Sequence, residues 1–242
     1  MANLCLSKEK FMIIAEIGQN HNGSMSLAKE LICAAHEAGA DVAKFQLFEA
    51  SKLFSKENNP WYEYNLSTEL KFEQAKMLFE YCNQIGIEFM ASAFDVHRVS
   101  WLESFGVRQH KIASRSIHDQ NLIDALIKTG KTLITSLGFW KSKSLPQFSD
   151  MRNVHFLHCI SQYPAPFDQV KLSEIDFEVI SGLSDHCLGL AASLAAISRG
   201  AKIIEKHFTL DKKMYGPDHS CSATPNELRD LVTLAKEIRA TL

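Results

Sequence analysis

The segment FMIIAEIGQNHNGSMSLAKELICAAHEAGADVAKFQLF, residues 11–48, contains the strongest indication of the fold. It begins with a short apolar run, 11–18, which indicates a buried strand. An amphipathic segment starts after Ser24, a residue suited to capping a helix N-terminus, and ends near Gly39. A second apolar run, 41–48, follows directly. A strand, a helix and a strand in this order predict a parallel β-α-β unit.

The same alternation continues through the rest of the chain. Further strands are predicted at 87–94, 107–114, 131–138, 153–160, 177–185 and 201–210. Helices are predicted at 67–86 with Ser67 or Thr68 as cap, at 97–106, from Asp119 to Thr129, as a weak helix broken by Pro146, near 170–176, at 188–200, and at the end with Thr224 as cap and Pro225 as first residue.

Eight strand–helix units account for nearly the whole chain, so the predicted fold class is α/β, a (β/α)8 TIM barrel that forms a single domain over residues 1–242. An open, doubly wound sheet is the competing α/β solution. Its glycine-rich first turn, GxGxxG, is missing here, because the turn after the first strand reads GQNHNGS, 18–24.

Composition excludes several classes of function. The chain has 242 residues, 46% of them hydrophobic, and a formal net charge of -2, which offers no basic surface for nucleic acid. No N-terminal leader pattern and no apolar run of about 20 residues is present, so we expect a cytoplasmic protein without a membrane partner. Six scattered cysteines without a CxxC pair indicate reduced thiols.

Polar residues gather at the predicted carboxyl ends of the strands, where barrel enzymes carry their chemistry. These residues are Glu16, Asn20, His21, Lys44, Gln46, Lys111, Ser114, Ser136, Ser184, His186, Glu205, His207 and, in a loop, Asp218. Glu205 and His207 lie two positions apart and therefore on one face of the last strand. Burying such groups without partners would cost several kcal/mol. We therefore expect them to converge on one site.

The histidines are candidate metal ligands. His186 and His207 fall at neighbouring strand ends, where both imidazoles could bind one divalent cation. Hydrogen-bonded histidines on the barrel rim are the alternative. Of the others, His110 and His155 are predicted to face the helix layer.

Lysines inside apolar strands form either a Schiff base or an anion clamp. Lys44 and Lys111 lie on different strands among several serines, which favours a phosphate-carboxylate anion over an imine. Side chains that extend to solvent are the alternative. Lys202 and Lys206 are predicted to face outward.

Six motifs in order resemble the sialic acid synthase family. They are IIAEIGQNHNG (13–23), DVAKFQ (41–46), KIAS (111–114), GLSDH (182–186), IIEKHFTL (203–210) and GPDHSCS (216–222). The resemblance implies a transferase of carbohydrate biosynthesis that condenses phosphoenolpyruvate with an N-acetylated amino-sugar aldose, such as N-acetylmannosamine. The products are a nonulosonic acid and phosphate.

The resemblance also implies roles for individual residues. His186 and His207 would hold a divalent metal, usually Mn²⁺, with Co²⁺ or Mg²⁺ as alternatives. The catalytic residues would be Glu16, Lys44, Lys111, Glu205 and Asp218. The substrate-binding residues would be Gln46, Ser114, Arg115, Ser136, Ser161, Tyr163 and Ser184.

Three departures from the family pattern stand out. The usual Gly-Ser-Gly-Glu after the strand-four lysine reads Ala113-Ser114-Arg115-Ser116, without its acid, and Ser161 stands where asparagine is frequent. The family's C-terminal antifreeze-like domain has no counterpart here. The alternatives are a shortened chain, a separate capping subunit, or a substrate other than N-acetylmannosamine, and a homodimer is a further candidate assembly.

Three hypotheses follow from these features. The first is a metal-dependent synthase. The second is a degenerate barrel that binds the sugar or phosphoenolpyruvate without full turnover, which the loss of the acid supports. The third is a lysine-based aldolase, which borohydride trapping with pyruvate would reveal.

Overall fold

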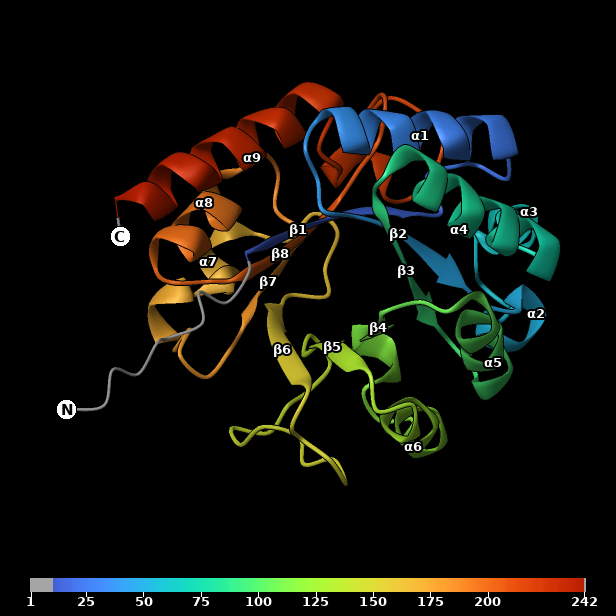
Figure 1. Ribbon diagram of the computed structural model, residues 1–242, viewed down its shortest axis with the longest axis horizontal. Coiled ribbons are helices and arrows are strands. Elements are labelled where there is room, and N and C mark those ends of the chain that lie inside the picture. The colour runs from blue at the N-terminus through green and yellow to red at the C-terminus, as the bar shows by residue number, and fades with distance from the viewer. Residues whose placement is uncertain (1–10, 242) are drawn as a thin grey trace.

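Eight parallel strands form the centre of the computed structural model, which describes residues 11–241 (Figure 1). The strands pair in chain order and the last closes onto the first, so the sheet is a closed barrel. Their bounds are β1 Met12–Gly18, β2 Val42–Leu47, β3 Glu88–Ala93, β4 Gln109–Ile112, β5 Thr132–Ser136, β6 Val154–Cys159, β7 Gly182–Asp185 and β8 Ile203–His207. The predicted (β/α)8 barrel is confirmed.

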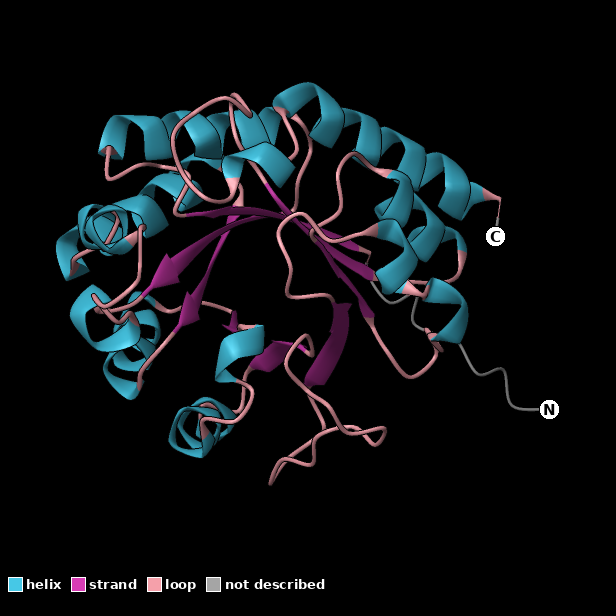
Figure 2. Ribbon diagram, turned by 180° about the vertical axis from the view of Figure 1, so that it is seen from behind, coloured by secondary structure: helices cyan, strands magenta, loops and turns pink. Residues whose placement is uncertain are grey.

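Helices surround the barrel on its outside (Figures 1 and 2). The α-helices are α1 Met25–Glu37, α2 Ala50–Leu53, α3 Tyr62–Ser67, α4 Phe72–Ile85, α5 Val96–Phe105, α6 Gln120–Lys128, α7 Phe167–Val170, α8 Ala191–Ser198 and α9 Pro225–Ala240, and the 3-10 turns are η1 Ser114–Ser116, η2 Leu172–Glu174 and η3 His219–Cys221. Ser24 and Thr224 cap α1 and α9 as predicted. Within residues 11–241, no helix is long and apolar enough to cross a membrane.

Side chains that point into the barrel form layers. The middle layer is apolar and consists of Ile14, Val42, Met90, Ile134, Leu157 and Ile203. Strand side chains alternate between the interior and the helix layer. Residues two positions beyond the middle layer therefore also point inward, at the carboxyl ends of the strands. This alternation places Glu16, Lys44 and Glu205 directly above the apolar middle layer.

The register of the strands sets which polar residues become neighbours. Glu16 on β1 lies beside Lys44 on β2 and beside His207 on β8. The pairing of β1 with β8 joins segments from the two ends of the described chain. On the other side of β8, Ser184 of β7 is aligned with Glu205.

One predicted helix starts at the wrong residue, and another is absent. The helix predicted from 67 starts later, because Ser67 and Thr68 belong to the end of α3, where their hydroxyls donate to the carbonyl of Tyr64. α4 then begins at Phe72, where the N–H of Lys71 donates to Gln74. The weak helix around Pro146 is absent: residues 137–153 form turns and irregular backbone.

Between β6 and β8 the predicted boundaries also need correction. β7 begins at Gly182, whereas residues 177–181 form a turn in which Asp176 accepts the N–H groups of Glu178 and Ile180. The helix expected near 170–176 is split into α7 and η2, because Lys171 takes a left-handed backbone conformation with φ 45°. Apolar residues in these segments resemble a strand or a helix in the sequence, but local turn contacts, which a hydrophobic pattern does not reveal, decide their structure.

Candidate active site

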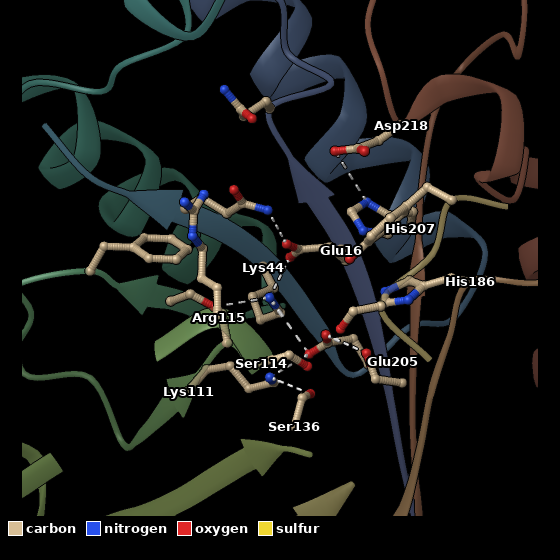
Figure 3. A pocket seen from close by; sticks show the side chains of 18 of the residues that line it. Glu16, Lys44, Lys111, Ser114, Arg115, Ser136, His186, Glu205, His207 and Asp218 are labelled. Atoms are coloured by element: carbon tan, nitrogen blue, oxygen red, sulfur yellow. Dashed lines mark hydrogen bonds and ion pairs between the residues drawn. The ribbon is translucent and has the colours of Figure 1, made fainter. Parts of the chain in front are cut away.

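A cavity of about 350 Å³ opens at the carboxyl ends of the strands (Figure 3). All fourteen residues predicted for the site line it: Glu16, Lys44, Gln46, Lys111, Ser114, Arg115, Ser136, Ser161, Tyr163, Ser184, His186, Glu205, His207 and Asp218. They come from seven of the eight strands or the loops that follow them. These fourteen side chains converge as predicted, whereas Asn20 and His21, which were also expected here, are buried and do not line the cavity.

A chain of alternating charges forms the floor of the cavity. Lys44 Nζ lies 2.7 Å from Glu16 Oε2 and 3.6 Å from Glu205 Oε2. Lys111 Nζ lies 3.8 Å from the same Glu205 oxygen and donates to Ser136 Oγ at 2.7 Å. Both lysine side chains are at most 2% exposed, so neither extends to solvent. The four charges neutralise one another inside the barrel.

Hydroxyl and amide groups hold this chain of charges in place. Ser184 Oγ donates to Glu205 Oε1 at 3.0 Å, and Gln46 Nε2 donates to Glu16 Oε1 at 2.9 Å. Lys44 also donates to Ser92 Oγ at 3.3 Å. Buried charges are tolerated when they are paired and hydrogen-bonded in this way. The floor is thus pre-organised before any ligand binds.

The pKa values of the carboxyl groups differ because their neighbours differ. Burial would raise the pKa of Glu205, but Lys111 and Lys44 outweigh it and hold this pKa at about 2. Burial raises the pKa of Glu16 despite the opposing effect of Lys44. Burial also lowers the pKa of Lys111, although Glu205 acts against it. Glu205 therefore carries the fixed negative charge, and Glu16 is the carboxyl closer to proton exchange.

The two candidate metal ligands lie side by side above this floor. The rings of His186 and His207 have centroids 5.5 Å apart, and the ring of Tyr163 lies 4.1 Å from that of His186. His186 Nδ1 donates to the carbonyl of Ile160 at 2.7 Å. His207 Nδ1 lies 4.0 Å from Asp218 Oδ2 and has no hydrogen-bond partner. The Nε2 atom of His186 is consequently left for another ligand.

The protonation of these histidines follows from burial and contacts. Burial lowers the pKa of His207 to about 4, which keeps its ring neutral. Burial acts in the same direction on His186, but its contacts with Cys159 and the Ile160 carbonyl outweigh it and raise the pKa. Among residues 11–241, no three His, Cys, Asp or Glu side chains are arranged to hold a metal ion.

The loop after β4 carries the departures from the family pattern. The guanidinium of Arg115 lies 4.9 Å from the centre of the Phe54 ring and donates to the carbonyl of Leu53 at 3.3 Å. Ser114 Oγ accepts the N–H of Gly138 at 3.1 Å and donates to a cysteine sulfur. Ser116 is buried and does not line the cavity. The loop therefore presents Ser114 and Arg115 to the cavity, whereas Ser116, at the position of the family's acid, does not reach it.

The prediction for one other basic residue, His155, is wrong. His155 faces the barrel interior instead of the helix layer, since its register partner is Ile134 of the apolar layer. With Lys202 it lines a cavity at the opposite end of the barrel. Lys206 points away from the interior as predicted, but it is buried. His110, in contrast, contacts Glu103 of α5 at 2.8 Å, so its prediction is confirmed.

Some lining residues are not among those predicted from the sequence. They are Gln19, Phe54, Ser92, Phe94, Ala113 and Phe139. Ser92 lies two positions after the inward-facing Met90, so the alternation rule could have found it. Phe54 and Phe139 lie in loops, where no periodic pattern reveals the direction of a side chain.

The chain matches the NeuB family over residues 31–242. It is 36% identical over 258 residues to the N,N'-diacetyllegionaminic acid synthase of Legionella pneumophila, covering 95% of this chain and 72% of that protein. It is 33% identical over 253 residues to the human N-acetylneuraminate-9-phosphate synthase, covering 95% and 70%. The crystal structure of the N-acetylneuraminic acid (sialic acid) synthetase from Leptospira borgpetersenii in complex with citrate superimposes with a TM-score of 0.87 at 32% identity, covering 96% and 85%.

Proposed function

The chain belongs to the NeuB family, and from this premise we propose that it condenses phosphoenolpyruvate with an N-acetylated amino-sugar aldose. The products are a nonulosonic acid and inorganic phosphate. Relatives named as synthases of such acids support the reaction class. The observation that carries the proposal is the pair of buried lysines, Lys44 and Lys111, beneath two adjacent histidines. The carboxylates of Glu16 and Glu205 balance the charges of these lysines.

We assign the lysines and the serines around them to phosphoenolpyruvate. Lys44 and Lys111 offer two cations, and Ser114, Ser136 and Ser184 offer hydroxyl groups around the same floor. Glu16 and Glu205 pair with the lysines when no substrate is bound. An incoming phosphate and carboxylate take over these contacts, and charge-assisted hydrogen bonds then hold the substrate in one orientation.

The histidines fit a divalent cation with two protein ligands. The observation in favour is the buried Nδ1 of His207, which lacks a partner, beside a His186 ring whose orientation Ile160 fixes. Such a backbone contact to the second nitrogen is typical of metal-binding histidines. When bound, the cation, Mn²⁺ in this proposal, supplies Lewis-acid polarisation of the aldehyde carbonyl.

The remaining residues handle the acceptor sugar and the protons. The methylene carbon of phosphoenolpyruvate forms the new bond to the aldehyde carbon, whose oxygen takes up a proton. Water then adds to the carbon that bears the phosphate group, next to the former methylene carbon. The bond between this carbon and the phosphate oxygen breaks, which leaves a 2-keto acid and inorganic phosphate. Glu16, whose pKa burial raises, takes up a proton once the substrate has displaced it from Lys44, and it is the proposed proton donor to the aldehyde oxygen. Gln46, Tyr163, Ser161, Arg115 and Asp218 surround the acceptor side of the cavity.

The direct test is phosphate release from phosphoenolpyruvate with a panel of N-acetylhexosamines and diacetamido sugars, with and without Mn²⁺. We expect release only when all three components are present. The variant His207→Ala should lose Mn²⁺ binding and turnover together, whereas His36→Ala on the exposed face of α1 should keep both. Absence of release from a Mn²⁺-loaded protein with every sugar would contradict the proposal.

Ser116 favours a second candidate, a barrel that binds these ligands without turnover, because the strand-four acid is missing. Calorimetry on the same panel separates the two. Heat of binding without phosphate release would support the binding protein, and release would exclude it.

A further inference from the structure

A buried ion pair lies on the outward face of β7 and β8, on the opposite side of the sheet from the cavity. Lys206 Nζ lies 3.1 Å from Asp185 Oδ2, and each side chain is 1% exposed. The same Asp185 oxygen accepts the hydroxyl of Ser193 on α8 at 2.6 Å. The pair thus joins two strands and one helix.

Both members of the pair also hold the backbone next to His186. Asp185 Oδ1 accepts the N–H of Cys187 at 2.8 Å, and Lys206 Nζ donates to the carbonyl of Cys187 at 2.8 Å. His186 therefore lies between Asp185, whose carboxylate is held by Lys206 and Ser193, and Cys187, whose backbone N–H and carbonyl are both hydrogen-bonded to the ion pair. Its own carbonyl accepts the N–H of Ala165 at 2.9 Å. Little freedom is left for the backbone that carries this imidazole.

The strand register relates the ion pair to both histidines. Asp185 is aligned with Lys206, and Ser184 is aligned with Glu205 one position earlier. His186 and His207 come one position later on the same two segments. Since strand side chains alternate, the Ser184–Glu205 pair and the two histidines point into the cavity, while the ion pair between them points outward.

We infer that Asp185 and Lys206 are positioning residues whose ion pair fixes the register and orientation in which His186 and His207 face one another. A slip of one residue between β7 and β8 would turn one histidine to the outer side of the sheet, and this slip would separate the ion pair. The inference rests on the proposed function for its catalytic consequence. The structural part of the inference, the relative orientation of the His186 and His207 rings, does not depend on the proposed function.

The test uses Lys206→Met and the double variant Asp185→Asn/Lys206→Met in the full-length protein. The double variant carries no unpaired buried charge and so guards against misfolding of the single one. Ile204→Ala is the matched control, because Ile204 is buried on the same outward face of β8 but touches neither the ion pair nor a histidine by hydrogen bond. Calorimetry with Mn²⁺ alone, the kcat and the KM for phosphoenolpyruvate are measured for each variant.

We expect Lys206→Met and the double variant to lose 10- to 100-fold, as an order of magnitude, in Mn²⁺ affinity, with a fall in kcat. The KM for phosphoenolpyruvate should change less than the Mn²⁺ affinity, because Lys44, Lys111 and Ser136 lie on other strands, although Ser184 lies on β7. Ile204→Ala should lose thermal stability while keeping Mn²⁺ affinity and kcat. Wild-type affinity and kcat in the double variant, or equal losses in Ile204→Ala, would overturn the inference.

A spectroscopic readout separates this inference from the proposed function. A nuclear Overhauser effect between the rings of His186 and His207 should be present in the wild type and in Ile204→Ala, and lost in Lys206→Met. If the wild type neither binds Mn²⁺ nor turns over, the proposed function fails, and this signal still decides the inference. Its persistence in Lys206→Met would show that the rings do not depend on the ion pair.

Discussion

At the residue scale, the two buried lysines lie inside the barrel because carboxylates accompany them. Lys44 contacts both Glu16 and Glu205, and Lys111 contacts Glu205. Removing Glu205 would leave the buried Lys111 without its carboxylate partner, which costs about 3–5 kcal/mol. This charged group is thus also a source of stability, so substitutions there change folding as well as ligand binding. Residues at the rim of the cavity are cleaner probes of ligand binding.

Arg115 is such a rim residue. Its guanidinium is oriented by Phe54 and the Leu53 carbonyl, which prepares it to bind an anionic ligand. We predict that Arg115→Ala raises the KM of an anionic substrate about tenfold, since one charge-assisted hydrogen bond contributes roughly 1.5 kcal/mol or more. Steady-state kinetics measure this, with Arg115→Lys and the exposed Arg108→Ala as controls. An unchanged KM for every substrate would remove Arg115 from the site.

The serines on either side of Arg115 form a matched pair of probes. Ser114 lines the cavity, whereas Ser116 is buried away from it. We predict that Ser116→Ala changes kcat/KM by less than about twofold, as for a substitution away from the ligand. Ser114→Ala should lower kcat/KM because it removes a hydroxyl from the lining. A larger effect of Ser116→Ala than of Ser114→Ala would contradict these assignments.

The residues of the site could be predicted from the sequence largely because they sit on strands. The period of two places Lys44 with Gln46 and Glu205 with His207, and the motif order supplies the rest. The burial of Lys206 could not be predicted this way. Its partner Asp185 comes from another strand, and the sequence pattern does not reveal which outward-facing lysines find a carboxylate in the helix layer. The roles proposed for these residues remain predictions.

At the element scale, boundaries follow from local contacts more than from periodicity. Thr224 and Pro225 mark the start of α9 clearly, because a capping hydroxyl and a proline at the first helical position are both local signals. The start of α4 was mispredicted at Ser67, because a second short helix, α3, uses the same hydroxyl residues as its end. Hydroxyl residues occur at both ends of helices, and the sequence alone does not choose between them.

The N-cap of α9 gives a prediction at this scale. Thr224 Oγ1 accepts the N–H of Glu227, and Glu227 accepts the N–H of Thr224 in return. Thr224→Ala should lower the free energy of unfolding by about 1 kcal/mol, as measured by urea denaturation. Thr233→Ala, on the exposed face of the same helix, should change it by less than about 0.5 kcal/mol. Equal effects of the two substitutions would show that the cap is not stabilising.

At the scale of the whole molecule, counting strand–helix units was enough to predict the barrel. A closed barrel is the common arrangement for eight strand–helix units with parallel strands, and the structure forms this barrel. The layering inside the ring also follows from the sequence, since six of the eight strands place an apolar residue in the middle layer below their carboxyl ends. The corrections concern loops, where the Pro146 segment and the turn before β7 lack a repeating pattern.

Acid sensitivity is a prediction for the whole molecule, carried by His21. Burial lowers the pKa of His21 to about 4 from 6.5, so the unfolded chain takes up a proton at a higher pH than the folded one. The stability contributed by the neutral ring is complete above pH 6.5 and is lost as the pH falls towards 4. The loss amounts to roughly 3 kcal/mol over this window, at about 1.4 kcal/mol per pKa unit.

The variant His21→Asn tests this prediction, because its side-chain oxygen can still accept the N–H that Gly23 donates to His21 Nδ1. The free energy of unfolding, measured by denaturant titration between pH 4 and 7, should fall less steeply for this variant than for the wild type. His36→Asn, on an exposed helix face, is the control for loss of one histidine. Parallel curves for His21→Asn and the wild type would contradict the prediction.

The alignment of Glu16 with His207 across β1 and β8 has a consequence for folding kinetics. These residues come from opposite ends of the described chain, so their contact has a high sequence separation, which slows folding. A ring that lacked the β1–β8 pairing would hold Lys44 and Lys111 without the complete pocket. A ligand that contacts both sides of this seam binds only the closed ring, and mass action then stabilises that state as ligand concentration rises. Bound substrate would thereby hold β1 and β8 together, and the rate at which these two strands separate would fall when substrate is abundant.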